Sequence, residues 1–271
     1  MEIVIFYILI FCIGTLFGSF FTLAVYRLPL HQDITHKRSY CPNCNHKLSF
    51  LDMIPILSYV FLGGKCRYCK TKIRIRYLLL EVVTGLLFLS WVISLKIDFS
   101  YIQTSKLIYL VVSLLYLAGI IIIAGIDKEK RTIFKSIILY EIILESIYMI
   151  YLYVLEGTNI YRYVIYLIAI ILLLIADSTY YKKYLKDNYI LDMFILSIVM
   201  TLFLGTDIYI FTLIITLLSV VFNIIWHWIK NKTNKYVKNN QKYLSKTPIG
   251  FYMCCSNIIV ALFFNFLTCG W

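Results

Sequence analysis

The sequence has 271 residues, of which 61% are hydrophobic and only 15% are charged, and its mean hydropathy is +0.83. A soluble domain cannot bury so large an apolar fraction, so the composition excludes a soluble globular protein and indicates an integral membrane protein. The formal net charge of +12 does not indicate a nucleic-acid surface, because the basic residues lie in short segments between apolar stretches.

Eight apolar stretches predict eight transmembrane helices. A bilayer core of about 30 Å needs about 20 helical residues, and most of the stretches approach or exceed that length. We therefore expect an all-α polytopic membrane protein, with the fifth and sixth stretches the shortest of the eight. The predicted spans are 3–26, 78–95, 107–126, 136–154, 161–176, 189–204, 208–229 and 249–268.

Basic residues between these stretches predict the orientation. Of the 26 lysines and arginines, 23 fall in alternate segments, which are 27–77, 127–135, 177–188 and 230–248. The positive-inside rule places these segments in the cytoplasm and both chain termini outside. The chain then divides into a first span (1–26), a cytoplasmic loop (27–77) and a seven-span membrane core (78–271).

Two cysteine pairs in the basic loop predict a zinc site. Cys41 and Cys44 form one CxxC turn, and Cys66 and Cys69 form a second. Each turn offers two thiolates, and together they complete the tetrahedron of a structural zinc, with no position left for a catalytic water. Two disulfides or four free thiols are the alternatives. Loop histidines are not needed, because the four-cysteine set is complete.

Several short motifs occur in one order and spacing within the region 14–85. They are Gly18–Phe20, Tyr26–Pro29, Ser39–Cys44, Ile54–Ser58, Gly64–Cys69, Arg76–Tyr77 and Glu81. In these motifs the region resembles the prepilin leader peptidases, also called type IV prepilin peptidases. After this region the resemblance is much thinner.

The resemblance implies an activity and a location. Such proteins are eight-span aspartic endopeptidases of the prokaryotic cytoplasmic membrane. They cut the leader from type IV prepilin or pseudopilin precursors at the cytoplasmic face, and many also methylate the new amino terminus with S-adenosyl-methionine. The implied partners are therefore a prepilin precursor peptide and the lipid bilayer, and no nucleic acid is expected.

The resemblance also implies a catalytic pair of aspartates. Asp127 ends the third span and matches the family's first position, and Asp192 begins the sixth span from the cytoplasmic side. Two nearby carboxyls in a partly dry site share one proton, so that one acts as base while the other acts as acid. However, Tyr189 and Leu191 stand where the family has glycines, and we expect them to narrow the approach to Asp192.

Other acids and other functions compete with this interpretation. Asp177 ends the fifth span on the cytoplasmic side, and we interpret it as a solvated loop residue. Glu141 and Glu145 lie one turn apart in the fourth span, where they either line the active-site cavity or form a hydrogen-bonded packing contact. A catalytically degenerate relative that binds prepilin or a membrane partner is one alternative. A channel is disfavoured because Asp127 and Asp192 lie near one face rather than at the bilayer midplane.

Overall fold

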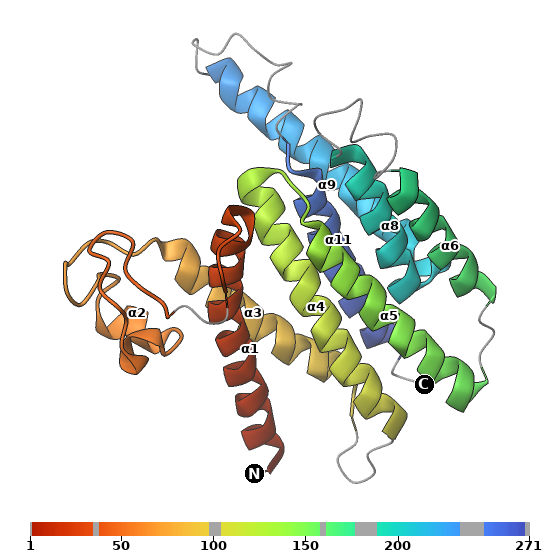
Figure 1. Ribbon diagram of the computed structural model, residues 1–271, viewed down its shortest axis with the longest axis horizontal. Coiled ribbons are helices and arrows are strands. Elements are labelled where there is room, and N and C mark those ends of the chain that lie inside the picture. The colour runs from red at the N-terminus through yellow and green to blue at the C-terminus, as the bar shows by residue number, and fades with distance from the viewer. Residues whose placement is uncertain are drawn as a thin grey trace. The chain divides into compact units, whose positions relative to one another are not determined.

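A computed structural model describes residues 2–34, 38–97, 104–157, 161–176, 189–233 and 247–268 (Figure 1). Helices dominate these ranges, and short 3₁₀ turns occur beside them. The elements are α1 (Glu2–Arg27), η1 (Leu28–Leu30), η2 (Phe50–Met53), α2 (Leu57–Phe61), α3 (Ile75–Ser94), α4 (Thr104–Lys130), α5 (Lys135–Glu156), α6 (Tyr161–Ala176), α8 (Tyr189–Leu204), α9 (Thr206–Thr233) and α11 (Ile249–Thr268).

The eight long helices coincide with the eight predicted apolar stretches, which confirms the all-α polytopic membrane class. In the described part of the chain, six of them (α1, α3, α4, α5, α9 and α11) are long and apolar enough to cross a membrane. The other two, α6 and α8, have 16 residues each. At a rise of 1.5 Å per residue, each of these is about 24 Å long, shorter than the typical hydrocarbon core.

The chain forms two compact units. The first contains Met1–Leu114 and Asn265–Trp271, and the second contains Leu115–Phe264. The boundary falls inside α4 and α11, so each of these helices contributes residues to both units. The predicted boundaries at residues 26 and 77 separate the first span, the cytoplasmic loop and the membrane core. These boundaries stay a prediction.

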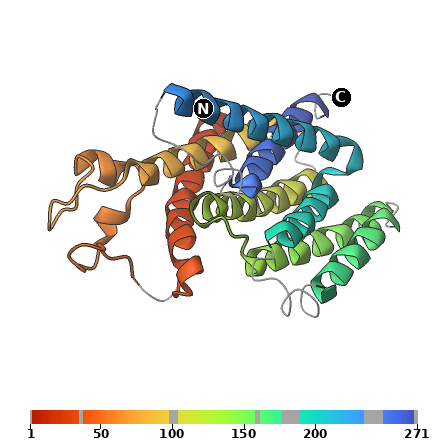
Figure 2. The same cartoon turned by 90° about the horizontal axis from the view of Figure 1, so that it is seen from above.

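Close packing of α1 against α3 organises the first unit (Figures 1 and 2). Gly14 and Gly18 form a small-xxx-small pattern on α1, which allows two membrane helices to approach through their backbones. A Cβ atom at Gly14 would lie 2.8 Å from the Cα of Gly85, and one at Gly18 would lie 2.8 Å from the Cα of Glu81. Glycine is therefore required at both positions of α1.

The same unit has an aromatic core. Trp91 on α3 is fully buried, and its indole N–H donates a hydrogen bond of 2.8 Å to the Ser113 hydroxyl on α4. Phe88 is also buried and lies 5.7 Å from Phe17, measured between ring centroids. Trp91 thus satisfies its one polar group while it fills the core, as a buried tryptophan must.

In the second unit, α8 packs against α5, α6 and α9 (Figure 2). The central helix is almost wholly apolar, and its buried residues are Leu191, Asp192, Ile195, Leu196, Val199, Met200 and Leu202. Tyr116 on α4 is fully buried and donates a hydrogen bond of 2.8 Å to the Asn257 side chain on α11. This bond joins two helices 141 residues apart in the chain.

Glu141 and Glu145 on α5 are buried in this second unit. Their side chains face away from solvent, and none of their carboxyl oxygens has a hydrogen-bond partner among the described residues. The Glu141 carboxyl packs directly against Gly119 of α4, where any side chain would overlap it. Glu141 therefore makes a packing contact, and no hydrogen bond to either carboxyl group occurs among the described residues.

Candidate metal centre and candidate active site

The two CxxC turns fold in the same way. In the first, the Cys41 N–H donates to the His46 carbonyl at 3.0 Å, and the Asn45 N–H donates to the Cys41 carbonyl at 2.8 Å. The second repeats both bonds between Cys66, Thr71 and Lys70, at 2.9 and 3.0 Å. One antiparallel bridge closes each turn, pairing Tyr40 with Lys47 and Lys65 with Lys72. The sequence thus builds two equivalent knuckles.

The knuckles bring their four thiols together. The Sγ atoms of Cys41, Cys44, Cys66 and Cys69 all lie within 4.8 Å of one another, and those of Cys41 and Cys69 are 3.8 Å apart. A disulfide needs about 2.05 Å, so these cysteines are free thiols rather than two disulfides. Four sulfurs at about 2.3 Å from one zinc ion would be separated by about 3.8 Å. The thiol cluster fits a tetrahedral metal.

Polar groups of one knuckle support the thiols of the other. The Asn43 amide donates to the Thr71 hydroxyl at 2.7 Å and contacts the Cys69 sulfur at 3.7 Å. Hydrogen bonds from the Thr71 side chain and backbone, joined by Asn43, lower the pKa of the Cys69 thiol to about 5. A thiolate is the form that binds metal, and such outer contacts commonly orient metal ligands.

The pKa of the Cys44 thiol is shifted in the opposite direction. The His46 backbone hydrogen bond lowers its pKa, but burial and the neighbouring Cys69 and Cys41 thiols outweigh that bond and raise the pKa to about 11. Four thiols this close cannot all ionise unless a cation offsets their charge, because like charges at short range disfavour each other. A cation bound among the four thiols would offset this repulsion.

Asp52 braces the segment between the two knuckles. Its carboxylate accepts bonds from the Ser49 N–H at 3.1 Å, the Ser49 hydroxyl at 2.7 Å and the Arg67 Nε at 2.6 Å. Burial acts to raise the pKa of Asp52, but the bonds from Ser49 and Arg67 prevail and hold that pKa below its usual value. Asp52 thereby connects η2 to the second knuckle.

Glu81, which had no predicted role, connects the loop to α3. Its Oε2 accepts a bond of 2.8 Å from the backbone N–H of Ile56. Ile56 adopts φ 61°, which is unusual for a β-branched residue. The bond to Glu81 helps to hold this conformation, so Glu81 is a tether between the zinc-knuckle region and the membrane helix.

Asp127 lies in the last turn of α4, and its carboxyl group contacts the start of α11. Its carboxyl group is fully buried, and Oδ2 accepts a bond of 2.8 Å from the Phe251 backbone N–H. The first N–H groups of a helix have no partner within the helix, and the helix dipole favours an anion beside them. The other oxygen, Oδ1, is buried and has no hydrogen-bond partner among the described residues.

Tyr189 completes the surroundings of Asp127. Its hydroxyl donates to Asp127 Oδ2 at 3.1 Å and accepts from the Gly250 N–H at 3.1 Å. A Cβ atom at Gly250 would lie 3.0 Å from Asp127 Oδ2 and 3.3 Å from the Met193 sulfur. The sequence predicted Tyr189 only as an obstacle and gave Gly250 no role.

Asp192 lies in the first turn of α8, one turn after Tyr189, and is 7% exposed. It lines a cavity of about 310 Å³, together with Lys135 and Ser136 at the start of α5. The Lys135 ammonium is 3.9 Å from Asp192 Oδ1. The remaining lining is apolar and consists of Ile138, Leu139, Ile142, Leu174 and Ile195. A buried carboxyl at the wall of a cavity is suited to acid–base chemistry.

The second unit therefore contains both predicted acids in different surroundings. Asp127 binds the start of α11 and the Tyr189 hydroxyl, whereas Asp192 faces the cavity and Lys135. Tyr189 is the link, because it precedes Asp192 by one helical turn and donates to Asp127. Asp177, the competing acid, lies outside the described residues, and Glu141 and Glu145 do not line the Asp192 cavity.

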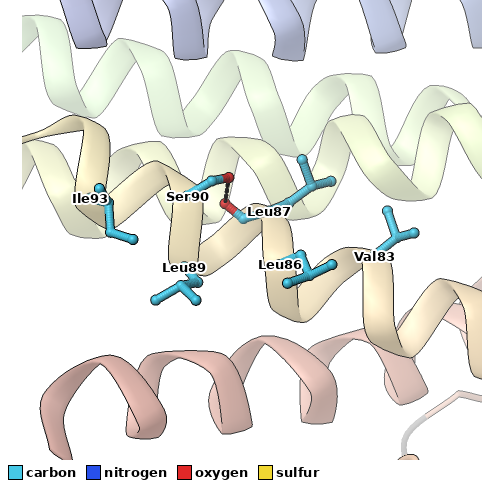
Figure 3. Close-up of a pocket in the computed structure, with 6 residues that line it drawn as sticks. All are labelled: Val83, Leu86, Leu87, Leu89, Ser90 and Ile93. Atoms are coloured by element: carbon cyan, nitrogen blue, oxygen red, sulfur yellow. Dashed lines mark hydrogen bonds between the residues drawn. The ribbon is translucent and has the colours of Figure 1, made fainter. Parts of the chain in front are cut away.

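A second hollow on α3 has no such chemistry. It measures about 350 Å³ and is lined by Val83, Leu86, Leu87, Leu89, Ser90 and Ile93 (Figure 3). The Ser90 hydroxyl, its only polar side-chain group, donates a bond of 3.0 Å to the Leu87 carbonyl of the same helix. An apolar groove without free polar groups is typical of a lipid-facing surface rather than a catalytic site.

The family model that matches this chain covers a stretch of the first unit. Residues 12–95 match the family model described as the bacterial peptidase A24 N-terminal domain. Three relatives are each named prepilin leader peptidase/N-methyltransferase. The Myxococcus xanthus protein is 43% identical over 84 residues, the Vibrio cholerae protein 41% over 85, and the Bacillus subtilis protein 42% over 80. These matches cover 31%, 28% and 30% of this chain.

The matched stretch is short relative to those proteins as well. It spans 25%, 34% and 32% of their respective lengths. No solved structure matches the chain. The family model contains the four clustered cysteines and Glu81 but ends before Asp127 and Asp192. Residues 12–95 thus match a bacterial peptidase A24 N-terminal domain, and this part of the chain is similar to part of the prepilin leader peptidase/N-methyltransferases.

Proposed function

We propose that this protein is a membrane aspartic endopeptidase that removes the leader peptide from type IV prepilin or pseudopilin precursors. The proposal combines the names of its relatives with the buried acids of the second unit. The protein would act in a prokaryotic cytoplasmic membrane. Its zinc loop and active site would face the cytoplasm, and both termini would lie outside, as the distribution of basic residues predicts.

The observation that carries the proposal is the environment of Asp127. Two donors hold its Oδ2, which leaves Oδ1 as the oxygen that can carry or receive a proton. Peptide hydrolysis by a pair of carboxyls needs one ionised group to activate water and one protonated group to assist the scissile peptide. Asp127 and Asp192 would divide these roles, because two nearby carboxyls in a dry site do not both ionise.

A zinc ion would have a structural role in this protein. Cys41, Cys44, Cys66 and Cys69 would hold it, since their spacing and geometry fit a closed tetrathiolate site. Bound zinc would supply folding free energy to a loop that has little apolar core of its own. The four ligands leave no open position, so the proposed hydrolysis does not use this metal.

Methylation is a second proposed activity, suggested by the name of the relatives. S-Adenosyl-methionine would be a substrate that donates its methyl group to the amine exposed by leader removal. No glycine-rich fingerprint for the methyl donor occurs in the sequence. Mass spectrometry of the processed pilin amino terminus tests this activity separately from cleavage.

The second candidate function is binding of prepilin without cleavage. The observation that favours it is Tyr189, whose hydroxyl occupies the side of Asp127 that the family's glycine would leave open. If the tyrosine is an obstacle, replacing Tyr189 and Leu191 by glycine should increase cleavage. If the tyrosine positions Asp127, the same change should decrease cleavage.

Coexpression with a prepilin from the same cell tests the proposed function. We expect the wild-type chain to release the leader, visible as a mobility shift on a gel and as a new amino terminus by mass spectrometry. The matched variants are Asp127→Asn and Asp192→Asn, with Asp177→Asn as the control. A wild-type chain that binds prepilin stably but never cleaves it would establish the binding function instead.

A further inference from the structure

The segment from η2 to α2 has an exposed apolar face although it lies in the predicted aqueous loop. Leu57, Val60 and Phe61 occupy positions i, i+3 and i+4, so they share one face of α2. Phe61 is 84% exposed and Phe50, on the adjoining η2, is 75% exposed. The exposed apolar residues of this face are Phe50, Leu51, Leu57, Val60 and Phe61.

The other side of α2 faces the protein. The Tyr59 hydroxyl donates to the Ile73 carbonyl at 3.4 Å, next to the second knuckle. Pro55, just before the helix, is buried. The polarity of α2 is therefore the reverse of a helix on a water-soluble protein, because its outward face is the apolar one. Five exposed large apolar side chains within residues 50–61 mark a contact with lipid or with another protein.

The tether to Glu81 places this segment at the depth of the membrane. Helix α3 has 20 residues, so its length of about 30 Å equals the hydrocarbon thickness and leaves nothing to project into water. Glu81 is the seventh residue of α3 and lies about 9 Å along its axis from Ile75. The bond of 2.8 Å from the Ile56 N–H to Glu81 holds the chain just before α2 at this level.

The basic residues that follow α2 in the chain fit a lipid surface. Lys65, Lys70, Lys72 and Arg74 are exposed and follow α2 in the chain. The one acid of the segment, Asp52, is bound to Arg67. Apolar side chains next to lysines and arginines are the composition of interfacial segments that bind anionic lipids.

We propose that residues Phe50–Phe61 are an interfacial segment that inserts its apolar face among the lipid acyl chains. Insertion would hold the zinc knuckles against the membrane surface. The occupant of the face is lipid, and the neighbouring basic residues contact anionic headgroups. This inference depends on the geometry of the first unit and does not depend on whether the chain cleaves prepilin.

Site-specific photocrosslinking tests the proposal in the full-length chain. A benzophenone amino acid replaces Phe61, or in a second variant Phe50, and the protein is placed in nanodiscs of phosphatidylethanolamine and phosphatidylglycerol. Replacement of one exposed aromatic side chain by another preserves the fold. The aqueous control position is Asn45, which is exposed on the first knuckle, and the lipid control is Leu217, exposed on α9.

We expect lipid adducts at positions 61 and 50 in a yield near that at position 217 and several-fold above that at position 45. Zinc content measured on each variant confirms that the knuckles are intact. An adduct yield at position 61 no higher than at position 45 would overturn the proposal. Crosslinks from position 61 to a protein instead of lipid, including an added prepilin, would also overturn it and identify the face as a protein-binding surface.

Discussion

The region that matches the A24 N-terminal domain (residues 12–95) and the second unit (Leu115–Phe264) present their functional groups in different ways. In the first, two CxxC turns place four thiols together, and each turn is closed by bonds between residues at most five apart. In the second, Asp127 is held by residues 62 and 124 positions away. Local spacing constrains the first region, whereas the second depends on how helices meet.

This difference explains where the similarity to known proteins falls. A knuckle loses its metal if one cysteine moves by one position, so its motif stays recognisable in any functional chain. A site formed at the ends of helices requires only that suitable hydrogen-bond donors lie close to the carboxyl group. Tyr189 can therefore stand at a glycine position of the family and still donate to Asp127. Loss of a motif in the second unit does not by itself mean loss of the site.

The first prediction, which has the largest expected effect, tests whether the catalytic acids lie in the second unit. Asp127→Asn and Asp192→Asn should each lower prepilin cleavage by roughly 10²–10⁴-fold, because each would remove one member of the proposed proton-sharing pair. Both variants should insert in the membrane and retain zinc, since neither touches the knuckles. Leader removal measured by mass spectrometry gives the rate. Cleavage that survives Asp192→Asn but is lost in Asp177→Asn would transfer the second role to Asp177.

The second prediction addresses the first region alone. Cys41→Ser should abolish zinc binding, because three thiolates and a hydroxyl do not complete the tetrahedron, and it should unfold the loop with the loss of metal. Metal analysis and limited proteolysis between residues 38 and 74 measure these changes. Cys12→Ser is the control, since Cys12 is an exposed thiol on α1. Wild-type protein purified without zinc under reducing conditions would contradict the assignment of this metal.

Much of the fold could be predicted from the sequence, because its cause is local. Continuous apolar runs predict all eight long helices, and the CxxC spacing predicts the thiol cluster. The contacts of Asp127 could not be predicted in this way. Nothing near Tyr189 or Gly250 in the sequence indicates that both meet an aspartate on α4. The same holds for Glu81, whose partner Ile56 is 25 residues earlier and adopts an unusual backbone conformation.

The third prediction separates the two possible roles of Tyr189. Tyr189→Phe keeps the ring and removes the hydroxyl, so Asp127 Oδ2 loses a donor and the Gly250 N–H loses its acceptor. A hydrogen bond to a charged group contributes about 1.5–3 kcal/mol, so kcat should fall about tenfold or more with little change in KM. The pH dependence of kcat should also shift. Tyr209→Phe, which removes another buried hydroxyl of this unit, is the control.

The fourth prediction concerns the close approach of α11 to Asp127. Gly250→Ala places a Cβ atom 3.0 Å from Oδ2, so the carboxyl group must shift by a few tenths of an ångström. Misplacement of a catalytic group lowers the rate, here by about threefold. Alanine is a better helix former than glycine by about 1 kcal/mol, which partly offsets the steric cost to stability. Cys255→Ala on the same helix should leave cleavage unchanged, and equal loss in both variants would refute a specific contact.

The fifth prediction has the smallest expected effect and concerns Asp52 in the first region. The pKa of Asp52 is lowered in the folded loop by its bonds to Ser49 and Arg67, although burial opposes the shift. A carboxyl whose pKa is lower when folded contributes stability at pH values above its unfolded pKa of about 3.9. That contribution is lost as the pH falls through the lowered folded value. Asp52→Asn should therefore make the loop more sensitive to proteolysis at pH 7, while at a pH below the lowered folded pKa the variant and wild type should converge. Because the Arg67 side chain is half exposed, solvent screens the pair and the change should be modest. A difference between the two proteins that persists unchanged at acid pH would show that Asp52 acts through its size rather than its charge.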